Sequence, residues 1–148
     1  MAEDLVDQLL RQTGLHVGTS TDTRQDGVQK VARIEVSALP GRSGVAIDYE
    51  GFPSVATPEN PFGHAEHAVL ARTSEGLGLF TAHMHAPVLA HLTERETGKF
   101  EPIEGTSPFP LAIAVDVPSP GRLIYTWSFE IPGAGQPIEI VGDVTLVA

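Results

Sequence analysis

Histidine is the residue type whose spacing in this 148-residue sequence most suggests chemistry, because five of its six copies lie in the middle third of the chain. Imidazole nitrogens bind transition metals and exchange protons near neutral pH. His83 and His85 are two residues apart in a segment with strand character, so both side chains would project from one face, about 7 Å apart along it. This spacing predicts two ligands of one divalent metal ion such as zinc, iron or manganese.

The segment before these two histidines should pair with theirs through a tight turn near residue 75. Around such a turn, residues whose numbers sum to about 150 lie opposite one another. This register would place His67 opposite His83, and either Glu66 or Ala65 opposite His85.

A metal site could then include His64 and Glu66, which share one face of their segment, together with His83 and His85. The alternative interpretation is that these histidines are surface or cavity groups that pair with nearby glutamates and hold no metal. Alternation favours the alternative, because His67 faces away from His64 and Glu66, and only part of the cluster can share one interior.

Composition limits the classes of partner. The chain has 19 acidic and 9 basic residues, and its net charge of −10 repels phosphate, so we expect neither nucleic acid nor a membrane surface as a partner. The absence of cysteine excludes disulfides, thiolate zinc sites and a cysteine nucleophile. No apolar run approaches the ~20 residues of a membrane span. The first residues are acidic where a signal peptide would be basic, which predicts a cytoplasmic protein.

Helical spacing of leucines and valine, with acidic residues in the first turn, predicts one short helix within residues 2–13 that ends at Gly14. After it the apolar period becomes two, and turn residues arrive about every ten positions. We expect strands at 15–23, 29–39, 43–52, 63–73, 76–86, 88–96, 109–117, 121–131 and 136–147, with a weaker one near 99–103. No later helix is long enough for a parallel crossover, which indicates an all-β fold.

Nine or ten hairpin-linked strands would leave two exposed sheet edges, and closure removes them. The sequence therefore predicts a single domain over residues 1–148, with a helix in 1–14 and an antiparallel up-and-down β-barrel of about ten strands in 15–148. The proline-rich segment 53–62 is the candidate portal loop.

Side chains that could meet a ligand inside the barrel follow from the same alternation. Tyr125 and Trp127 share an apolar face, and they would either line a cavity with polar tips inward or pack in the core. Arg33, Arg72 and Arg122 lie in strands, and one that pointed inward would anchor a ligand carboxylate. The site prediction therefore includes Arg72 and Arg122 as ligand-binding candidates beside His83 and His85.

The layout of a short helix followed by about ten meandering strands resembles the fatty-acid-binding-protein branch of the calycin barrels, nearest the bacterial barrels related to nitrobindin. Residues 13–18 (TGLHVG) resemble the G-x-W-x-G opening of that family, with His16 in place of the tryptophan. Residues 64–72 (HAEHAVLAR) resemble its H-x-E-x-G-x-x-R hairpin, without the glycine.

This resemblance implies a barrel that holds a small molecule. Haem-binding members of the family use a histidine near the C-terminus as axial ligand, whereas the last histidine of this chain is His91. We therefore expect no haem bound in that manner. The sequence favours no particular cofactor and leaves a divalent metal ion open.

Three functions compete. The first is a binding protein that holds an apolar or amphipathic molecule, since a ten-stranded barrel is wide enough for a cavity; a buried arginine or polar trio in an apolar interior would favour it. The second is a metal-binding barrel or metalloenzyme that uses the histidine cluster. The third is a packed barrel that acts through a surface patch or a homodimer interface. No nucleophile elbow or phosphate loop is present, so binding ranks above catalysis.

Overall fold

The computed structural model of the protein describes residues 3–23, 30–52, 58, 64–84, 86–104, 107, 109–130, 133 and 135–147. These ranges contain one α-helix, α1 (Leu5–Leu10), and a short 3₁₀ helix, η2 (Pro40–Arg42). Their strands are β1 (Gly14–Asp22), β2 (Lys30–Ala38), β3 (Gly44–Phe52), β4 (His64–Thr73), β5 (Gly76–His83), β6 (Ala86–Glu96), β7 (Lys99–Pro102), β8 (Leu111–Asp116), β9 (Arg122–Phe129) and β10 (Ile138–Leu146).

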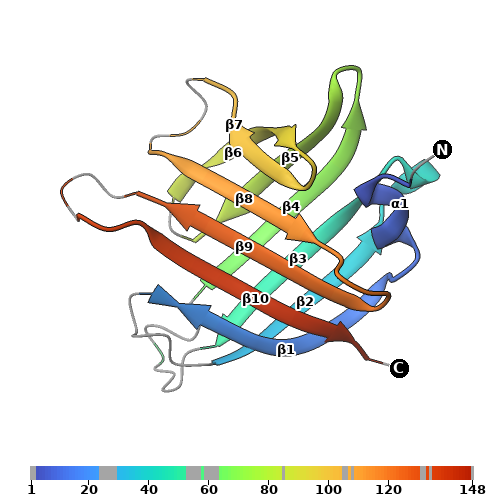
Figure 1. Ribbon diagram of the computed structural model, residues 1–148, viewed down its shortest axis with the longest axis horizontal. Helices are drawn as coiled ribbons and strands as arrows, with labels where there is room; N and C mark the ends of the chain where they lie inside the picture. The colour runs from blue at the N-terminus through green and yellow to red at the C-terminus, as the bar shows by residue number, and fades with distance from the viewer. Residues whose placement is uncertain are drawn as a thin grey trace.

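Each of these strands pairs antiparallel with its neighbours in the chain, and β1 also pairs with β10, so the sheet closes into a barrel (Figure 1). The predicted all-β, up-and-down barrel with one short N-terminal helix is confirmed. None of the described helices is long and apolar enough to cross a membrane.

Two predicted boundaries are wrong. The helix ends at Leu10 rather than near residue 13, since Arg11 caps it with backbone bonds to Gln8 and Leu9. Strand β5 ends at His83 rather than at residue 86, because the chain turns at Met84 and the next strand pairs back from Ala86. Of the H-x-H sequence, His83 is the last residue of β5, and His85 lies outside the described residues.

Alternation decides which side chains enter the barrel. In β9, Leu123, Tyr125, Trp127 and Phe129 are buried while the residues between them are partly exposed, as the apolar pattern predicted. Strand β2 shows the same alternation over Lys30–Ala38. Because the period of a strand is two, one apolar residue facing inward fixes the direction of every other side chain in that strand.

One end of the barrel is covered by α1, which contacts β2, β3 and β4. We call it the helix end; it carries the β2–β3, β4–β5, β6–β7 and β8–β9 turns, and the other five connections form the loop end (Figure 1). The apolar stripe of α1, formed by Leu5, Val6, Leu9 and Leu10, is buried against the interior. A six-residue helix is unstable by itself, so this burial is what maintains it.

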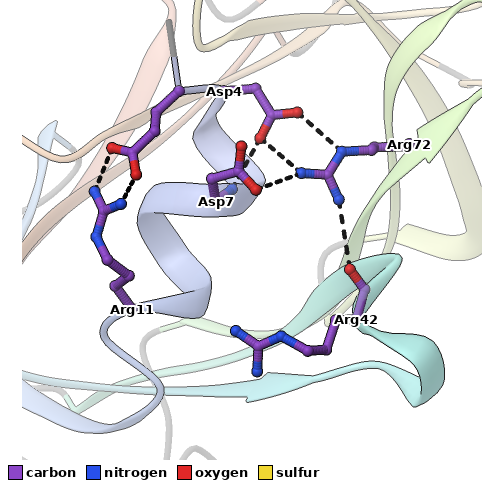
Figure 2. Close-up of polar contacts among 6 residues, drawn as sticks. Asp4, Asp7, Arg11, Arg42 and Arg72 are labelled. Atoms are coloured by element: carbon purple, nitrogen blue, oxygen red, sulfur yellow. Dashed lines mark hydrogen bonds and ion pairs between the residues drawn. The ribbon is translucent and has the colours of Figure 1, made fainter. Parts of the chain in front are cut away.

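Polar contacts orient the helix on the barrel (Figure 2). The Arg72 guanidinium donates to both carboxylate oxygens of Asp4 and to Asp7, at 2.7–3.0 Å, and to the carbonyl oxygen of Arg42. Arg11 pairs with Glu3. These groups are exposed, so each ion pair contributes only about 0–1 kcal/mol, and their effect is mainly on the direction of the helix.

Buried polar groups also seal the helix end. The Gln12 carboxamide donates to the carbonyl oxygen of Arg122 and accepts from the backbone N–H of Gly121. It also contacts the ring of His16, whose other nitrogen lies 3.1 Å from the carbonyl oxygen of Gly14. Burial lowers the pKa of His16, which favours the neutral ring. His16 is thus one of the buried polar groups that seal the helix end.

Replacing Leu9 by Ala tests the role of α1. Leu9 is fully buried, and its truncation should lower the free energy of unfolding by roughly 2–5 kcal/mol. Leu89→Ala is the matched control, because Leu89 is 66% exposed and its truncation should change stability by less than ~0.5 kcal/mol. Urea denaturation measures both; equal effects would contradict the docking of α1 as a stabilising contact.

Candidate functional site

Buried polar and aromatic side chains gather inside the barrel toward the loop end. They lie on inward positions at the loop-end halves of β1, β2, β3, β4, β5 and β9. We call this set the inner cluster: Ser20, Asp22, Lys30, Tyr49, His64, Glu66, Thr81, His83, Tyr125 and Trp127. The interior near α1 is instead built mainly from aliphatic residues and Phe100, with Gln12 and His16 as buried polar groups.

Strand register explains why part of the cluster forms a row. Tyr49 on β3 pairs with Glu66 on β4, and Glu66 pairs with His83 on β5. All three positions face inward, so directly opposed side chains lie about 4.5–5.5 Å apart at their Cβ atoms. His64 lies two residues before Glu66 and faces the same way.

Glu66 is the charged centre of this row. Its side chain is fully buried, and the hydroxyl of Tyr125 donates to one carboxylate oxygen, Oε1. The other oxygen, Oε2, lies 3.6 Å from Nε2 of His64 and accepts no hydrogen bond from the described residues. A buried acceptor left unsatisfied costs about 1–3 kcal/mol, and more when charged, so this oxygen is a place where a bound donor would be stabilised.

Tyr49 is held on two sides. Its hydroxyl is 2.9 Å from Oγ of Ser20, and its ring packs edge-on against His64 with centroids 5.0 Å apart. Gly142 on β10 makes room for this ring, since a Cβ atom there would lie 2.5 Å from Cε2 of Tyr49. The tyrosine is therefore fixed by β1, β4 and β10 together.

Trp127 connects the inner cluster with a further group of rings. Its ring centroid lies 5.1 Å from that of His64, 4.5 Å from His83 and 4.2 Å from Phe129. Phe109 contacts both Phe129, at 5.6 Å, and His83, at 6.3 Å. Burial lowers the pKa of His83, opposed in part by the Glu66 carboxylate, which favours a neutral ring.

These outer rings line a groove in the barrel wall. The described pairing of β7 with β8 consists of Lys99 opposite Ala114 and Phe100 opposite Ile113, whereas β9 pairs with the whole of β8. Beyond Phe100 the wall opens into a groove of about 630 Å³. We call it the β7–β8 groove; it is lined by Glu101, Pro102, Ile103, Glu104, Ser107, Phe109, Pro110, Leu111, Ala112, Ser128, Phe129, Glu130 and Pro137.

The structure brings together most of the residues that the sequence singled out. His64, Glu66, His83, Tyr125 and Trp127 all belong to the inner cluster. His85 and most of the predicted portal segment 53–62 lie outside the described residues.

The predicted register is wrong by one residue. Opposed residues of β4 and β5 sum to 149, so Glu66 rather than His67 faces His83. His67 points outward and contacts Asp48 instead, in agreement with its predicted orientation away from Glu66. A register shift of one residue changes which face of the neighbouring strand lies opposite a given residue. For this reason His83 has the carboxylate of Glu66 opposite it and not the imidazole of His67.

The predicted metal site does not form among the described residues. No group of three or more histidine and carboxylate side chains in this part of the chain is placed to hold a metal ion. Glu66 is bonded to Tyr125, and His83 lies against the ring of Trp127. His64, Glu66 and His83 are therefore arranged as a hydrogen-bonding and aromatic cluster.

The three strand arginines, any of which would have been a carboxylate anchor if it pointed inward, all face outward. Arg122 makes a two-point contact with Asp143 at 2.7 and 3.0 Å, and Arg72 binds the carboxylates of α1. Arg33 is also exposed. All three guanidinium groups remain hydrated beside carboxylates, which avoids the large cost of burying an unpaired charge.

Sequence reasoning missed the groove and five members of the inner cluster, which are Ser20, Asp22, Lys30, Tyr49 and Thr81. Tyr49 follows Val45 and Ile47 at spacing two, and this alternation could have placed it inward. The groove has no local signal, because it depends on where β7 stops pairing with β8 and on Phe109, which lies outside any strand.

Comparison with known protein-family models and with curated protein sequences finds no match for this chain. The specific branch of the calycin barrels therefore has no support beyond the shared architecture of a ten-stranded antiparallel barrel with a short N-terminal helix.

Tyrosine titration tests the burial of the cluster, because Tyr49 and Tyr125 are the only tyrosines of the chain. Burial raises the pKa of Tyr49 to about 12, with the carboxylates of Glu66 and Asp22 adding to the increase. Burial and Glu66 also raise the pKa of Tyr125 well above its usual range. The native protein should therefore show no tyrosinate absorbance near pH ~10, where exposed tyrosines ionise.

Stability should depend on pH in the same range. The unfolded chain releases tyrosine protons above pH ~10 while the native state keeps them, so the free energy of unfolding falls as pH rises from there toward and beyond 12. Denaturation in urea at pH 8, 10 and 11 measures this decline, and Tyr49→Phe should reduce its slope. A native titration with the urea-unfolded midpoint would contradict the burial of both hydroxyls.

Proposed function

We propose that this protein binds a small, mainly apolar molecule with one polar end, held between the β7–β8 groove and the inner cluster. The observation that carries this proposal is the unbroken series of ring contacts from Phe109 and Phe129 in the groove, through Trp127 and His83, to the buried polar row beside Glu66. In this interpretation the groove is the entrance and the inner cluster recognises the polar end.

The size and lining of the groove fit such a ligand. Its volume of about 630 Å³ falls in the usual range of ~300–1,000 Å³ for small-molecule sites. Aromatic and aliphatic side chains line it, and the polar groups of the cluster converge beyond it, which is the common composition of a ligand pocket. A polar trio in an apolar interior, here His64, Glu66 and Tyr125, is the feature expected of a binding barrel.

Charge argues against a fatty-acid type of ligand. Glu101, Glu104 and Glu130 line the groove, and the whole chain carries a net charge of −10. The arginines of the described strands face outward. A carboxylate ligand would meet negative potential at the entrance and no arginine anchor, so we propose a neutral or cationic molecule.

The alternatives have less support. The residues predicted to bind metal do not form a metal-binding group in the described part of the chain. The third alternative is a barrel whose interior is packed only for stability. Aliphatic residues would stabilise such a barrel more than a buried glutamate, two histidines and a threonine, because burying a polar group costs free energy unless it forms hydrogen bonds.

Blocking the groove tests the proposal. Ala112 is exposed and lines the groove, so Ala112→Phe should fill part of it and weaken ligand binding about tenfold or more. Val17→Phe is the control, since Val17 is 41% exposed on β1 and does not line the groove. Binding of naphthylmethylamine and naphthylmethanol, measured by calorimetry, compares both variants with the unchanged protein.

Native mass spectrometry of the protein purified from cells provides the complementary measurement. We expect a bound organic mass that is reduced in Ala112→Phe and retained in Val17→Phe. Equal binding by the two variants would contradict the groove as the entrance. A protein that carries no bound mass and binds neither probe would contradict ligand binding altogether.

A further inference from the structure

We infer that the polar end of the ligand is a cationic N–H donor, an ammonium or amidinium group, and that the Oε2 atom of Glu66 is its acceptor. This inference rests on the proposed function and names the class of molecule that the site selects.

The first argument is the hydrogen bonding of Glu66. Its side chain is fully buried, and among the described residues only Oε1 receives a hydrogen bond, from Tyr125. Nε2 of His64 lies 3.6 Å from Oε2, which is beyond hydrogen-bond distance. A carboxylate oxygen in a low-dielectric interior is a strong acceptor, and a charged donor beside it would offset the cost of its burial.

A second polar group lies diagonally opposite. Thr81 on β5 is fully buried and faces inward, and its hydroxyl makes no hydrogen bond within the described part of the chain. It pairs with Ala68, the next inward residue after Glu66, and with Ala90 on β6. Both alanines have small side chains, so they crowd the hydroxyl of Thr81 little. An N–H group at Oε2 of Glu66 has a second partner within reach there.

The remaining charges near the cluster leave it negative. Asp22 and Lys30 line the same small space beside His64 and Ser20, and their formal charges sum to zero. His83 is neutral at neutral pH, because burial lowers its pKa. Glu66 is the other acidic side chain of the inner cluster, and a cationic ligand at its free oxygen would balance a carboxylate charge there, whereas an anionic ligand would not.

Three ligands with one ring system and different polar ends test this inference. Naphthylmethylamine is a cation, naphthylmethanol is a neutral donor and naphthoate is an anion. The unchanged protein should bind the amine about tenfold or more tightly than the alcohol, and naphthoate more weakly than either, because a hydrogen bond to a charged group is stronger than a neutral one.

Glu66→Gln removes the charge and keeps an oxygen that can accept from Tyr125. We expect this variant to lose about tenfold or more in affinity for the amine and to keep its affinity for the alcohol within about twofold. Glu139→Gln is the matched control, since Glu139 is exposed on β10, and it should bind all three ligands like the unchanged protein. Thr81→Val should weaken the amine and the alcohol together, by several-fold.

The outcomes separate this inference from the proposed function. If amine and alcohol bind equally to the unchanged protein and to Glu66→Gln, the ligand class is wrong while binding in the groove stands. If none of the three binds, the proposed function itself is contradicted. Should Glu66→Gln fail to fold, as judged by fluorescence of the single tryptophan, Trp127, the order of affinities in the unchanged protein still decides.

Discussion

Backbone pairing between β1 and β10 is the constraint on which the rest of the structure depends. It runs from His16 opposite Leu146 to Asp22 opposite Ile140, and it joins the two ends of the sheet. Closure leaves no edge strand exposed. It also gives the sheet an inner and an outer face, so the side chains of each strand alternate between the interior and the surface. Burial of the apolar face then fixes the direction of every barrel side chain, including the polar ones near the loop end.

The interior is divided along the barrel axis. Near α1, aliphatic side chains and the buried stripe of the helix form a core. This core stabilises the folded protein through its buried apolar area and its close packing. Toward the loop end the same inward positions carry Tyr49, Glu66 and Tyr125, which gain less from burial and depend on each other for hydrogen bonds. The aliphatic half can therefore support a half that contains costly buried polar groups.

The short pairing between β7 and β8 leaves a groove in the barrel wall. Where its pairing with β8 stops, the aromatic side chains that would be covered by a continuous sheet line a groove, and they contact the rings of the inner cluster. Acidic residues line that groove, and the arginines that could have given it a positive potential pair with aspartates outside. Shape and charge thus point to the same ligand class, an apolar molecule with a donor at one end.

The sequence by itself determined the barrel, because alternation such as Leu123 to Phe129 and the turn residues between strands are local signals with a period of two. It also identified half of the inner cluster, namely His64, Glu66, His83, Tyr125 and Trp127. Only the tertiary structure decided which side chains of the inner cluster contact each other. Tyr125 donates to Glu66, which lies 59 residues away in the chain. A register difference of one residue places Glu66 rather than His67 opposite His83. Local patterns state which face is apolar, whereas contacts across a closed barrel depend on the register and curvature of all its strands together.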